Sequence, residues 1–101
     1  MVGMFTIRFA DVVAQHLDHI RAVDRATVLD AIESQLTHEP LVETRNRKPL
    51  RPNPLAPWEL RVGALRVFYE VVPSAARVVR VLAVGRKTRN ALRVGRREIR
   101  L

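Results

Sequence analysis

The chain has 101 residues, a hydrophobic content of 48%, no cysteine and a formal net charge of +8. This length predicts a single compact domain over residues 1–101, and the lack of cysteine excludes disulfide bonds and thiolate metal sites. No apolar run approaches the roughly 20 residues of a membrane-spanning helix, and an acidic residue follows the N-terminus too soon for a signal peptide, so we expect a cytoplasmic protein without a membrane partner.

Charge divides the chain into an acidic and a basic part. Residues 1–43 contain 3 Lys or Arg and 7 Asp or Glu, whereas residues 44–101 contain 15 and 3, which gives the second part a net charge of +12. A basic region of this strength attracts polyanions, and nucleic acid is the first partner that it indicates. The alternative is that the arginines only keep the surface soluble.

The acidic part predicts one strand and two helices. Residues 4–9 alternate apolar and polar side chains and include β-branched and aromatic ones, which is typical of a strand. Residues 11–21 and 25–38 have helical periodicity, with Asp11 and Asp24 in place to cap their N-termini. Their apolar faces predict a helical hairpin packed on a sheet and consist of Val13, Leu17, Ile20, Val28, Leu29, Ile32 and Leu36.

The basic part begins with a proline-rich loop over residues 44–57, and the prolines reduce the ordering cost of presenting its charges. Three alternating segments follow, residues 58–62, 65–72 and 77–84, with turn residues between them. This spacing predicts an antiparallel three-stranded meander whose last strand ends at Gly85. The predicted fold class is therefore α+β, with an N-terminal strand, a helical hairpin and one small sheet.

The sequence predicts a helical turn over residues 88–94 and a short strand over residues 98–101. His16 and His19 lie three residues apart in the first helix, but no third ligand lies near them in the sequence. We therefore expect neither a metal nor another cofactor.

The residues that carry candidate chemistry are basic and lie in three separate segments. Arg61 and Arg66 flank the turn between two adjacent strands, so their side chains can lie side by side across it. The residues after Gly85 join them if the third strand ends at the same edge of the sheet. So many positive charges repel one another unless an anion lies between them, and a phosphate fits that requirement. The whole set is Arg45, Arg47, Lys48, Arg51, Arg61, Arg66, Arg86, Lys87, Arg89 and Arg93.

The order of these elements, together with four sequence segments, resembles the RelE/ParE superfamily of bacterial type II toxins. The segments are TRNRKPL at residues 44–50, WELRVG at 58–63, LRVFYEV at 65–71 and AVGRK at 83–87. The resemblance covers nearly the whole chain. It implies a RelE-like fold and a toxin that an acidic antitoxin, encoded next to it, neutralises. RelE-like members cleave mRNA in the ribosomal A site, and ParE-like members poison DNA gyrase.

Of these two activities the resemblance favours the RelE-like one, an endoribonuclease that arrests translation and whose partners are mRNA and the ribosome. The reaction needs no metal, because the RNA 2′-OH attacks the adjacent phosphate. The resemblance implies a catalytic set of Lys48, Arg61, Arg66 and Lys87, in which Arg66 stabilises the phosphate and Arg86 replaces Lys87 if the register shifts by one residue. We expect RNA binding from the remaining basic residues, which are Arg45, Arg47, Arg51, Arg86, Arg89 and Arg93.

The chain departs from the RelE-like pattern at two places. Glu59 occupies the position of a second catalytic lysine, and neither Tyr nor His follows Gly85, where Arg93 is the nearest substitute. Glu59 can act as a base, but a cross-strand salt bridge beside Arg61 is the simpler interpretation. Tyr69 is interpreted as a structural aromatic residue.

These departures keep two alternatives open. One is a superfamily member that is not a nuclease: a gyrase poison, or a weakened toxin that only binds RNA or its antitoxin. The other is a basic binding module unrelated to toxins.

Overall fold

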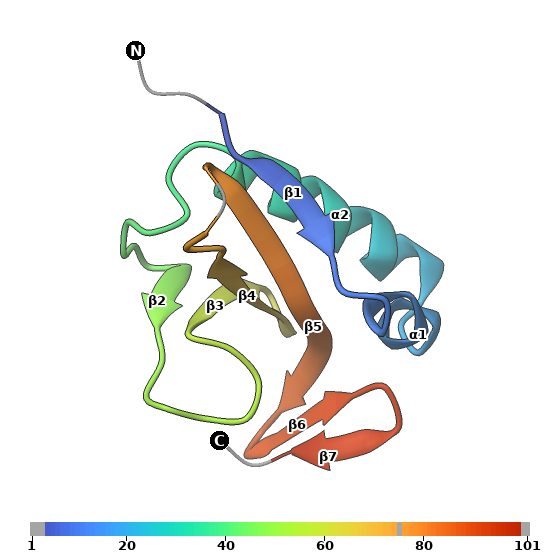
Figure 1. Cartoon of the computed structure of the whole chain (residues 1–101). Helices are drawn as coiled ribbons and strands as arrows, with labels where there is room; N and C mark the ends of the chain where they lie inside the picture. Colours follow the sequence, from blue (N-terminus) through green and yellow to red (C-terminus); the bar gives the residue numbers. More distant parts are fainter. Residues whose placement is uncertain (1–3, 75, 100–101) are drawn as a thin grey trace.

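The computed structural model describes residues 4–74 and 76–99. Two helices lie on one face of a sheet, which has seven strands in this part of the chain (Figure 1). The expected α+β architecture, with a helical hairpin and an antiparallel meander, is confirmed. The elements are β1 (Thr6–Phe9), α1 (Val13–Asp18), α2 (Ala22–Leu36), β2 (Arg47–Pro49), β3 (Trp58–Val62), β4 (Leu65–Val71), β5 (Val78–Thr88), β6 (Ala91–Val94) and β7 (Arg97–Ile99).

The sheet is built around β5, its longest strand (Figure 1). Its strands follow the order β2-β3-β4-β5-β6-β7, and all pairs along this path are antiparallel. β1 pairs in parallel with the first half of β5, from Thr6 opposite Val78 to Phe9 opposite Val81, whereas β6 pairs with the second half. One edge of β5 is therefore shared by two strands, and among the described residues neither pairs with residues 82–84.

The helices cover one face of the sheet with apolar side chains. Val13 of α1 and Val28, Ile32 and Leu36 of α2 are buried against the sheet, as their spacing predicts. Burying a side chain of this size stabilises the fold by about 1.5–3 kcal/mol. Leu29 was expected on the same face but is 41% exposed, because it lies outside the stripe that the other three residues of α2 form. The sheet contributes Leu60, Leu65, Val67, Tyr69, Val79, Val81 and Val84 to this core.

The opposite face of the sheet carries a second, smaller apolar cluster. Phe68 and Ala83, on the central strands, are buried there with Leu92 of β6. The proline-rich segment before β3 adds Ala56 to the same cluster. Because successive side chains of a strand point to opposite faces, Arg66 lies on the same face as Phe68.

The N-termini of the helices differ from the prediction. α1 begins at Val13 and α2 at Ala22, and no side chain caps either helix. Asp24 lies in the first turn of α2 instead of at its cap, and there its negative charge suits the positive end of the helix dipole.

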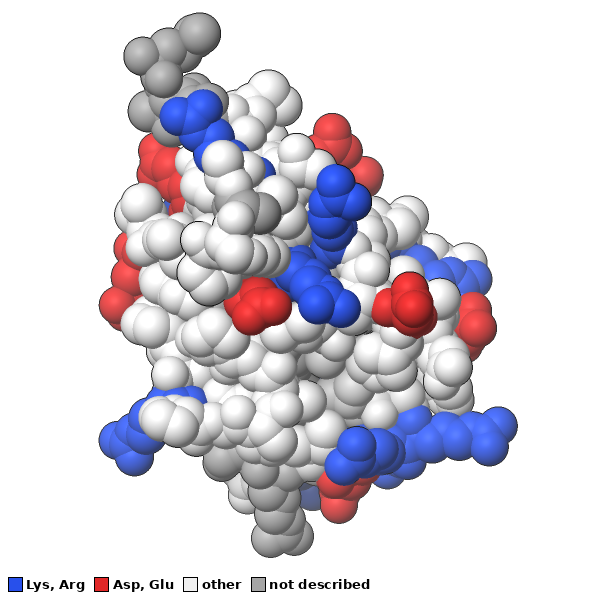
Figure 2. Space-filling model, viewed as in Figure 1, with Lys and Arg blue, Asp and Glu red and all other residues white. Residues whose placement is uncertain are grey.

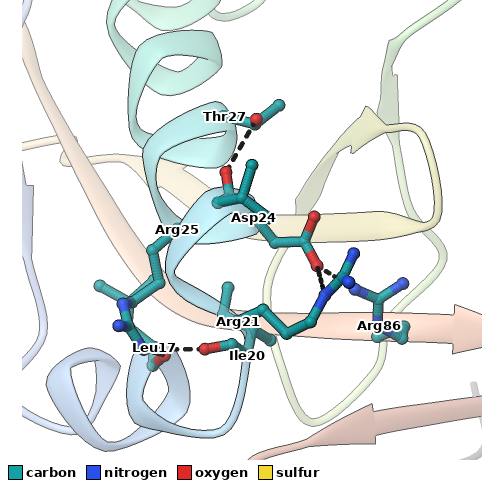
Figure 3. Close-up of polar contacts among 8 residues, drawn as sticks. Leu17, Ile20, Arg21, Asp24, Arg25, Thr27 and Arg86 are labelled. Atoms are coloured by element: carbon teal, nitrogen blue, oxygen red, sulfur yellow. Dashed lines mark hydrogen bonds and ion pairs between the residues drawn. The ribbon is translucent and has the colours of Figure 1, made fainter.

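Arg25 ties the two helices together (Figure 3). Its Nη1 atom donates hydrogen bonds to the carbonyl oxygens of Leu17, at 3.2 Å, and Ile20, at 2.8 Å, near the end of α1. These carbonyls have few partners within the short first helix, so the guanidinium satisfies them. In the described part of the chain, neither helix is long and apolar enough to cross a membrane.

Gly85 lies inside β5, so the prediction that this strand ends there is wrong. The strand continues to Thr88. A Cβ atom at Gly85 would lie 2.5 Å from the carbonyl oxygen of Arg93 and 2.8 Å from Cγ2 of Val94. The absence of a side chain therefore allows β6 to approach β5 closely.

The tail forms strands, so the predicted helical turn over residues 88–94 is also wrong. Thr88 pairs with Ala91 across a tight turn in which Arg89 has a φ of 53°. The apolar run that follows was too short to distinguish a strand from a helical turn, and its pairing with β5 decides between them. The strand predicted at residues 98–101 overlaps β7 at residues 98–99, and residues 100–101 lie outside the described part of the chain.

Candidate phosphate-binding site

Arg66 lies near the start of β4, and its side chain is the most enclosed of the candidate catalytic groups. The residue is 8% exposed. Its Nη1 atom donates hydrogen bonds to the carbonyl oxygens of Gly63, at 2.7 Å, and Leu65, at 2.9 Å, which fixes the guanidinium beside the β3–β4 turn. Its Nε atom is buried and has no hydrogen-bond partner in the described part of the chain.

Neighbouring groups shift the pKa of Arg66 in opposite directions. Burial lowers the pKa of its guanidinium, the Glu59 carboxylate raises it, and the neighbouring Arg61 lowers it. A guanidinium nevertheless stays protonated in proteins. Arg66 is therefore a permanent positive charge held in a largely dry position.

Glu59 on β3 is the counter-charge of Arg66. Its Oε1 atom lies 3.7 Å from Nε of Arg66, and its Oε2 atom lies 3.8 Å from Nζ of Lys48 on β2. The Glu59 side chain is 7% exposed, whereas that of Lys48 is 50% exposed. The predicted cross-strand salt bridge is present, but its partners are Arg66 and Lys48, and not Arg61.

Strand register brings two more basic residues to the same face. Arg61 on β3 lies directly opposite Arg66, as the sequence predicts for residues that flank a tight turn. Gly85 on β5 lies opposite Arg66 on the other side, so Lys87, two residues later, shares that face. The backbone N–H of Lys87 donates to the carbonyl oxygen of Ala64 at 2.8 Å, which places Lys87 beside the β3–β4 turn.

These five residues form one group, the sheet-face cluster: Lys48, Glu59, Arg61, Arg66 and Lys87. The four positions that the resemblance assigns to catalysis thus come from four strands and lie on one face, with a single carboxylate among them. Four positive charges against one negative charge make this part of the sheet electropositive. Such a cluster suits an anion that accepts several hydrogen bonds, and a phosphodiester is one.

Arg47 does not join the sheet-face cluster, although RNA binding was expected from it. It lies on β2, a strand where the sequence predicted only a loop, and its side chain points to the opposite face from Lys48. The residue is buried, and its guanidinium donates to the carbonyl oxygen of Val42 at 3.0 Å, to that of Gln35 at 2.6 Å and to the Gln35 side chain at 3.2 Å. These bonds attach the edge strand to α2.

Arg86 and Arg93 also lie away from the sheet-face cluster. They are paired across β5 and β6 on the face that carries the helices. Nη2 of Arg86 donates to Oδ2 of Asp24 at 2.5 Å, and Nε of Arg21 approaches the same oxygen at 3.4 Å (Figure 3). Register therefore decides between the two candidates after Gly85: Lys87 belongs to the cluster, and Arg86 anchors the start of α2.

Arg45, Arg51 and Arg89, the other residues expected to bind RNA, are exposed. Arg45 precedes β2, Arg51 follows it, and Arg89 occupies the β5–β6 turn. Figure 2 shows Lys and Arg side chains gathered at the lower right, where the β6–β7 hairpin lies in Figure 1, beneath a broad band without charge. The exposure of the three arginines is compatible with contact to a polyanion.

Tyr69 is structural, as interpreted from the sequence. Its hydroxyl donates to the carbonyl oxygen of Pro40 at 2.7 Å, and its ring lies 6.1 Å from that of Trp58. Burial raises the pKa of this hydroxyl far above its ordinary value. Tyr69 is thus unsuited to proton transfer.

His16 has a role that sequence reasoning missed. Its Nδ1 atom accepts a hydrogen bond from the backbone N–H of Val84 at 3.3 Å, in the part of the β5 edge that neither β1 nor β6 covers. The side chain thus replaces a missing strand. Nothing local in the sequence indicates which strand N–H will lack a partner. Among the described residues, no group of three or more His, Asp or Glu side chains could hold a metal ion.

Comparison with known proteins supports the fold. No protein-family model matches the chain, and no curated protein matches its sequence. The chain is similar to one chain in the crystal structure of the toxin–antitoxin complex RelBE2 from Mycobacterium tuberculosis, with a TM-score of 0.72 and 25% sequence identity over 86% of this chain and 95% of that one. The chain has the fold of a RelE-type toxin. The resemblance to the RelE/ParE superfamily is thereby confirmed. Within this RelE-type fold, the sheet-face cluster occupies the strands that follow the helical hairpin.

Proposed function

We propose that this protein is the toxin of a toxin–antitoxin system and that it cleaves mRNA during translation. One observation carries the second part of the proposal: Lys48, Arg61, Arg66 and Lys87 lie on one face of the sheet, where Arg66 supplies a buried positive charge for a phosphate. The similarity to a chain of the RelBE2 toxin–antitoxin complex supports the first part.

The chemistry proposed for this site needs no metal. The 2′-OH of one nucleotide attacks the adjacent phosphorus in line and gives its proton to solvent water, the P–O5′ bond breaks, and the products carry a 2′,3′-cyclic phosphate and a 5′-OH. The transition state gathers negative charge on the non-bridging oxygens, which Arg66 and Arg61 can stabilise from fixed positions. Lys48 and Lys87 are the ammonium groups available to protonate the leaving 5′ oxygen.

An antitoxin is the partner that the charge distribution supports. The basic part of the chain has a net charge of +12, which an acidic segment would neutralise. Large apolar side chains on the surface offer contacts for the apolar side of such a segment, namely Met4, Phe9, Val12, Val23, Leu29, Leu41 and Val42. Binding to the folded toxin would raise its melting temperature by mass action.

A gyrase poison or a toxin that only binds RNA is the second candidate, and a specific observation favours it. The carboxylate nearest to Arg66 belongs to Glu59, which two cations hold, and neither Tyr nor His follows Gly85 in the sequence. Proton transfer is therefore less well provided for than phosphate binding. In this case Lys48 and Arg66 would bind an anion without cleaving it.

Induction of the protein in cells that lack its antitoxin separates the two candidates. The endoribonuclease proposal expects rapid arrest of protein synthesis and new mRNA 5′ ends within translated codons. A gyrase poison would instead produce double-strand breaks covalently attached to gyrase and induce DNA repair, with mRNA left intact. Growth arrest with neither effect would contradict both activities.

A further inference from the structure

Glu59 lies between two cations of the sheet-face cluster without being hydrogen-bonded to either. Its oxygens are 3.7 Å from Nε of Arg66 and 3.8 Å from Nζ of Lys48, beyond the 2.7–3.2 Å of an N–H···O hydrogen bond. At these distances the carboxylate still attracts both cations, and its 7% exposure keeps solvent screening low. The contact is therefore electrostatic and has no hydrogen-bonded geometry that would lock it.

The Arg66 guanidinium makes only some of the hydrogen bonds that its N–H groups allow. Nη1 is used by two carbonyl oxygens, whereas Nε is buried without a hydrogen-bond partner among the described residues. A buried donor without a partner costs free energy, and a ligand that supplies the partner is one explanation for such a group in a native protein. The Glu59 carboxylate thus stays close to Arg66 but does not form a hydrogen bond with its Nε atom.

A phosphodiester could replace the carboxylate with little change in local charge. Each carries one negative charge and accepts several hydrogen bonds from ammonium and guanidinium groups. Bound between Lys48 and Arg66, the phosphate would meet the Glu59 carboxylate as a like charge. The two anions therefore exclude one another.

We propose that Glu59 is an exchangeable counter-ion: its carboxylate is the shared counter-charge of Lys48 and Arg66 in the free protein and moves aside when an RNA phosphodiester binds between them. The inference rests on the proposed function, since it concerns the charge of the same site. Its consequence is that Glu59 lowers the affinity of the free protein for RNA.

The two other roles open to Glu59 predict different outcomes for its removal. If Glu59 positioned Arg66 for RNA, its loss would weaken RNA binding. If it were the general base, its loss would slow cleavage and leave the binding of an uncleavable RNA unchanged. Only a competing counter-ion predicts tighter binding after Glu59 is made neutral.

The test measures binding of a fluorescent single-stranded oligoribonucleotide whose 2′-hydroxyls are methylated, so that it cannot be cleaved. Glu59→Gln is compared with the wild type and with Glu98→Gln, which removes the same charge from an exposed residue of β7. We expect Glu59→Gln to bind roughly three- to tenfold more tightly at low salt and Glu98→Gln to differ by less than about twofold. Melting temperatures of all variants are recorded first.

A second variant provides a test in case Glu59→Gln does not fold, and a double-mutant comparison measures the coupling between Glu59 and Lys48. If Glu59→Gln proves unstable, Glu59→Asp withdraws the carboxylate by one methylene and should tighten binding by roughly two- to threefold. Lys48→Gln is then made in both backgrounds, since its half-exposed side chain tolerates replacement. It should weaken binding more strongly when Glu59 is neutral than in the wild type, because Glu59 no longer masks the Lys48 charge.

Weaker or unchanged RNA binding by Glu59→Gln would overturn the inference while leaving the proposed function standing. Equal tightening in Glu98→Gln would overturn it too, because the effect would then be one of net charge alone. If neither the wild type nor any variant binds the oligoribonucleotide at low salt, the proposed RNA-directed function itself fails.

Discussion

Nη2 of Arg86 on β5 donates a hydrogen bond of 2.5 Å to the carboxylate of Asp24 in the first turn of α2. The two residues are separated by 62 positions in the sequence, so this contact joins the helical hairpin to the central strand (Figure 3). Lys87, the next residue, points to the opposite face. Two adjacent basic residues thus have different roles, one in the fold and one in the candidate site.

Replacing Arg86 should mainly affect stability, and replacing Lys87 should mainly affect activity. We expect Arg86→Ala to lower the free energy of unfolding by about 1 kcal/mol, because a charge-assisted bond of a partly exposed ion pair is lost. Lys87→Ala should leave stability nearly unchanged and reduce RNA cleavage by roughly 10- to 100-fold through the loss of one charge near the phosphate. Urea denaturation and cleavage of translated mRNA measure the two effects. A loss of activity in Arg86→Ala without destabilisation, together with full activity in Lys87→Ala, would show that Arg86, and not Lys87, belongs to the site.

His16 should make the stability of the protein depend on pH. Burial and the nearby His19 lower the pKa of His16 from 6.5, so the folded state favours the neutral ring that accepts the Val84 N–H. This contribution is complete above the unfolded pKa and is lost as the pH falls below it through the folded one. Between about pH 7.5 and about pH 5.5, the wild type should therefore lose stability, whereas His16→Ala should be less stable at the higher pH and change less.

The control for the pH experiment is His38→Ala, since His38 is exposed at the end of the helical hairpin. Its melting temperature should follow the wild type across the same pH range. Parallel pH curves for the wild type and His16→Ala would show that the imidazole of His16 does not contribute in this way.

Gly85→Ala should loosen the C-terminal hairpin from β5. The added Cβ would lie 2.5 Å from a backbone oxygen of Arg93, which cannot move without breaking strand pairing, and we expect a destabilisation of about 2–3 kcal/mol. Gly63→Ala is the control: its φ of 60° is strained for alanine, but no atom lies within 4 Å, so about 1 kcal/mol is expected. Chemical denaturation of both variants gives the comparison. Equal losses would argue against the close approach of β5 and β6.

Much of the sheet could be predicted because its signals are local. Alternation gave the bounds of β3, and the glycine turn after it implied that Arg61 and Arg66 lie opposite one another, as they do. The apolar spacing of α2 likewise identified Val28 and Ile32 as core residues. In each case the partners are close in the chain, so the pattern and the structure express the same geometry.

The features that could not be predicted from the sequence depend on contacts between segments that are distant in the chain. Arg47 and Lys48 look alike in a proline-rich loop, and only the pairing of β2 with β3 sends one to α2 and the other to the sheet-face cluster. Glycine often marks a turn, but Gly85 lies inside β5 and allows the close approach of β6, a strand that was not predicted. Sequence periodicity carries no information on such contacts, because they are set by tertiary packing.

Arg66→Ala most directly tests the proposal that Arg66 holds the scissile phosphate. The variant is expressed without antitoxin at a level matched to the wild type, with Arg80→Ala, an exposed arginine of β5, as the control. Loss of a charge-assisted contact to the phosphorane should cost about 3–4 kcal/mol, a decrease of roughly 10²- to 10³-fold in cleavage, and should abolish growth arrest. Folding, judged by circular dichroism, and antitoxin binding should be retained, and Arg80→Ala should remain toxic. Undiminished mRNA cleavage and growth arrest in Arg66→Ala would contradict the proposed site.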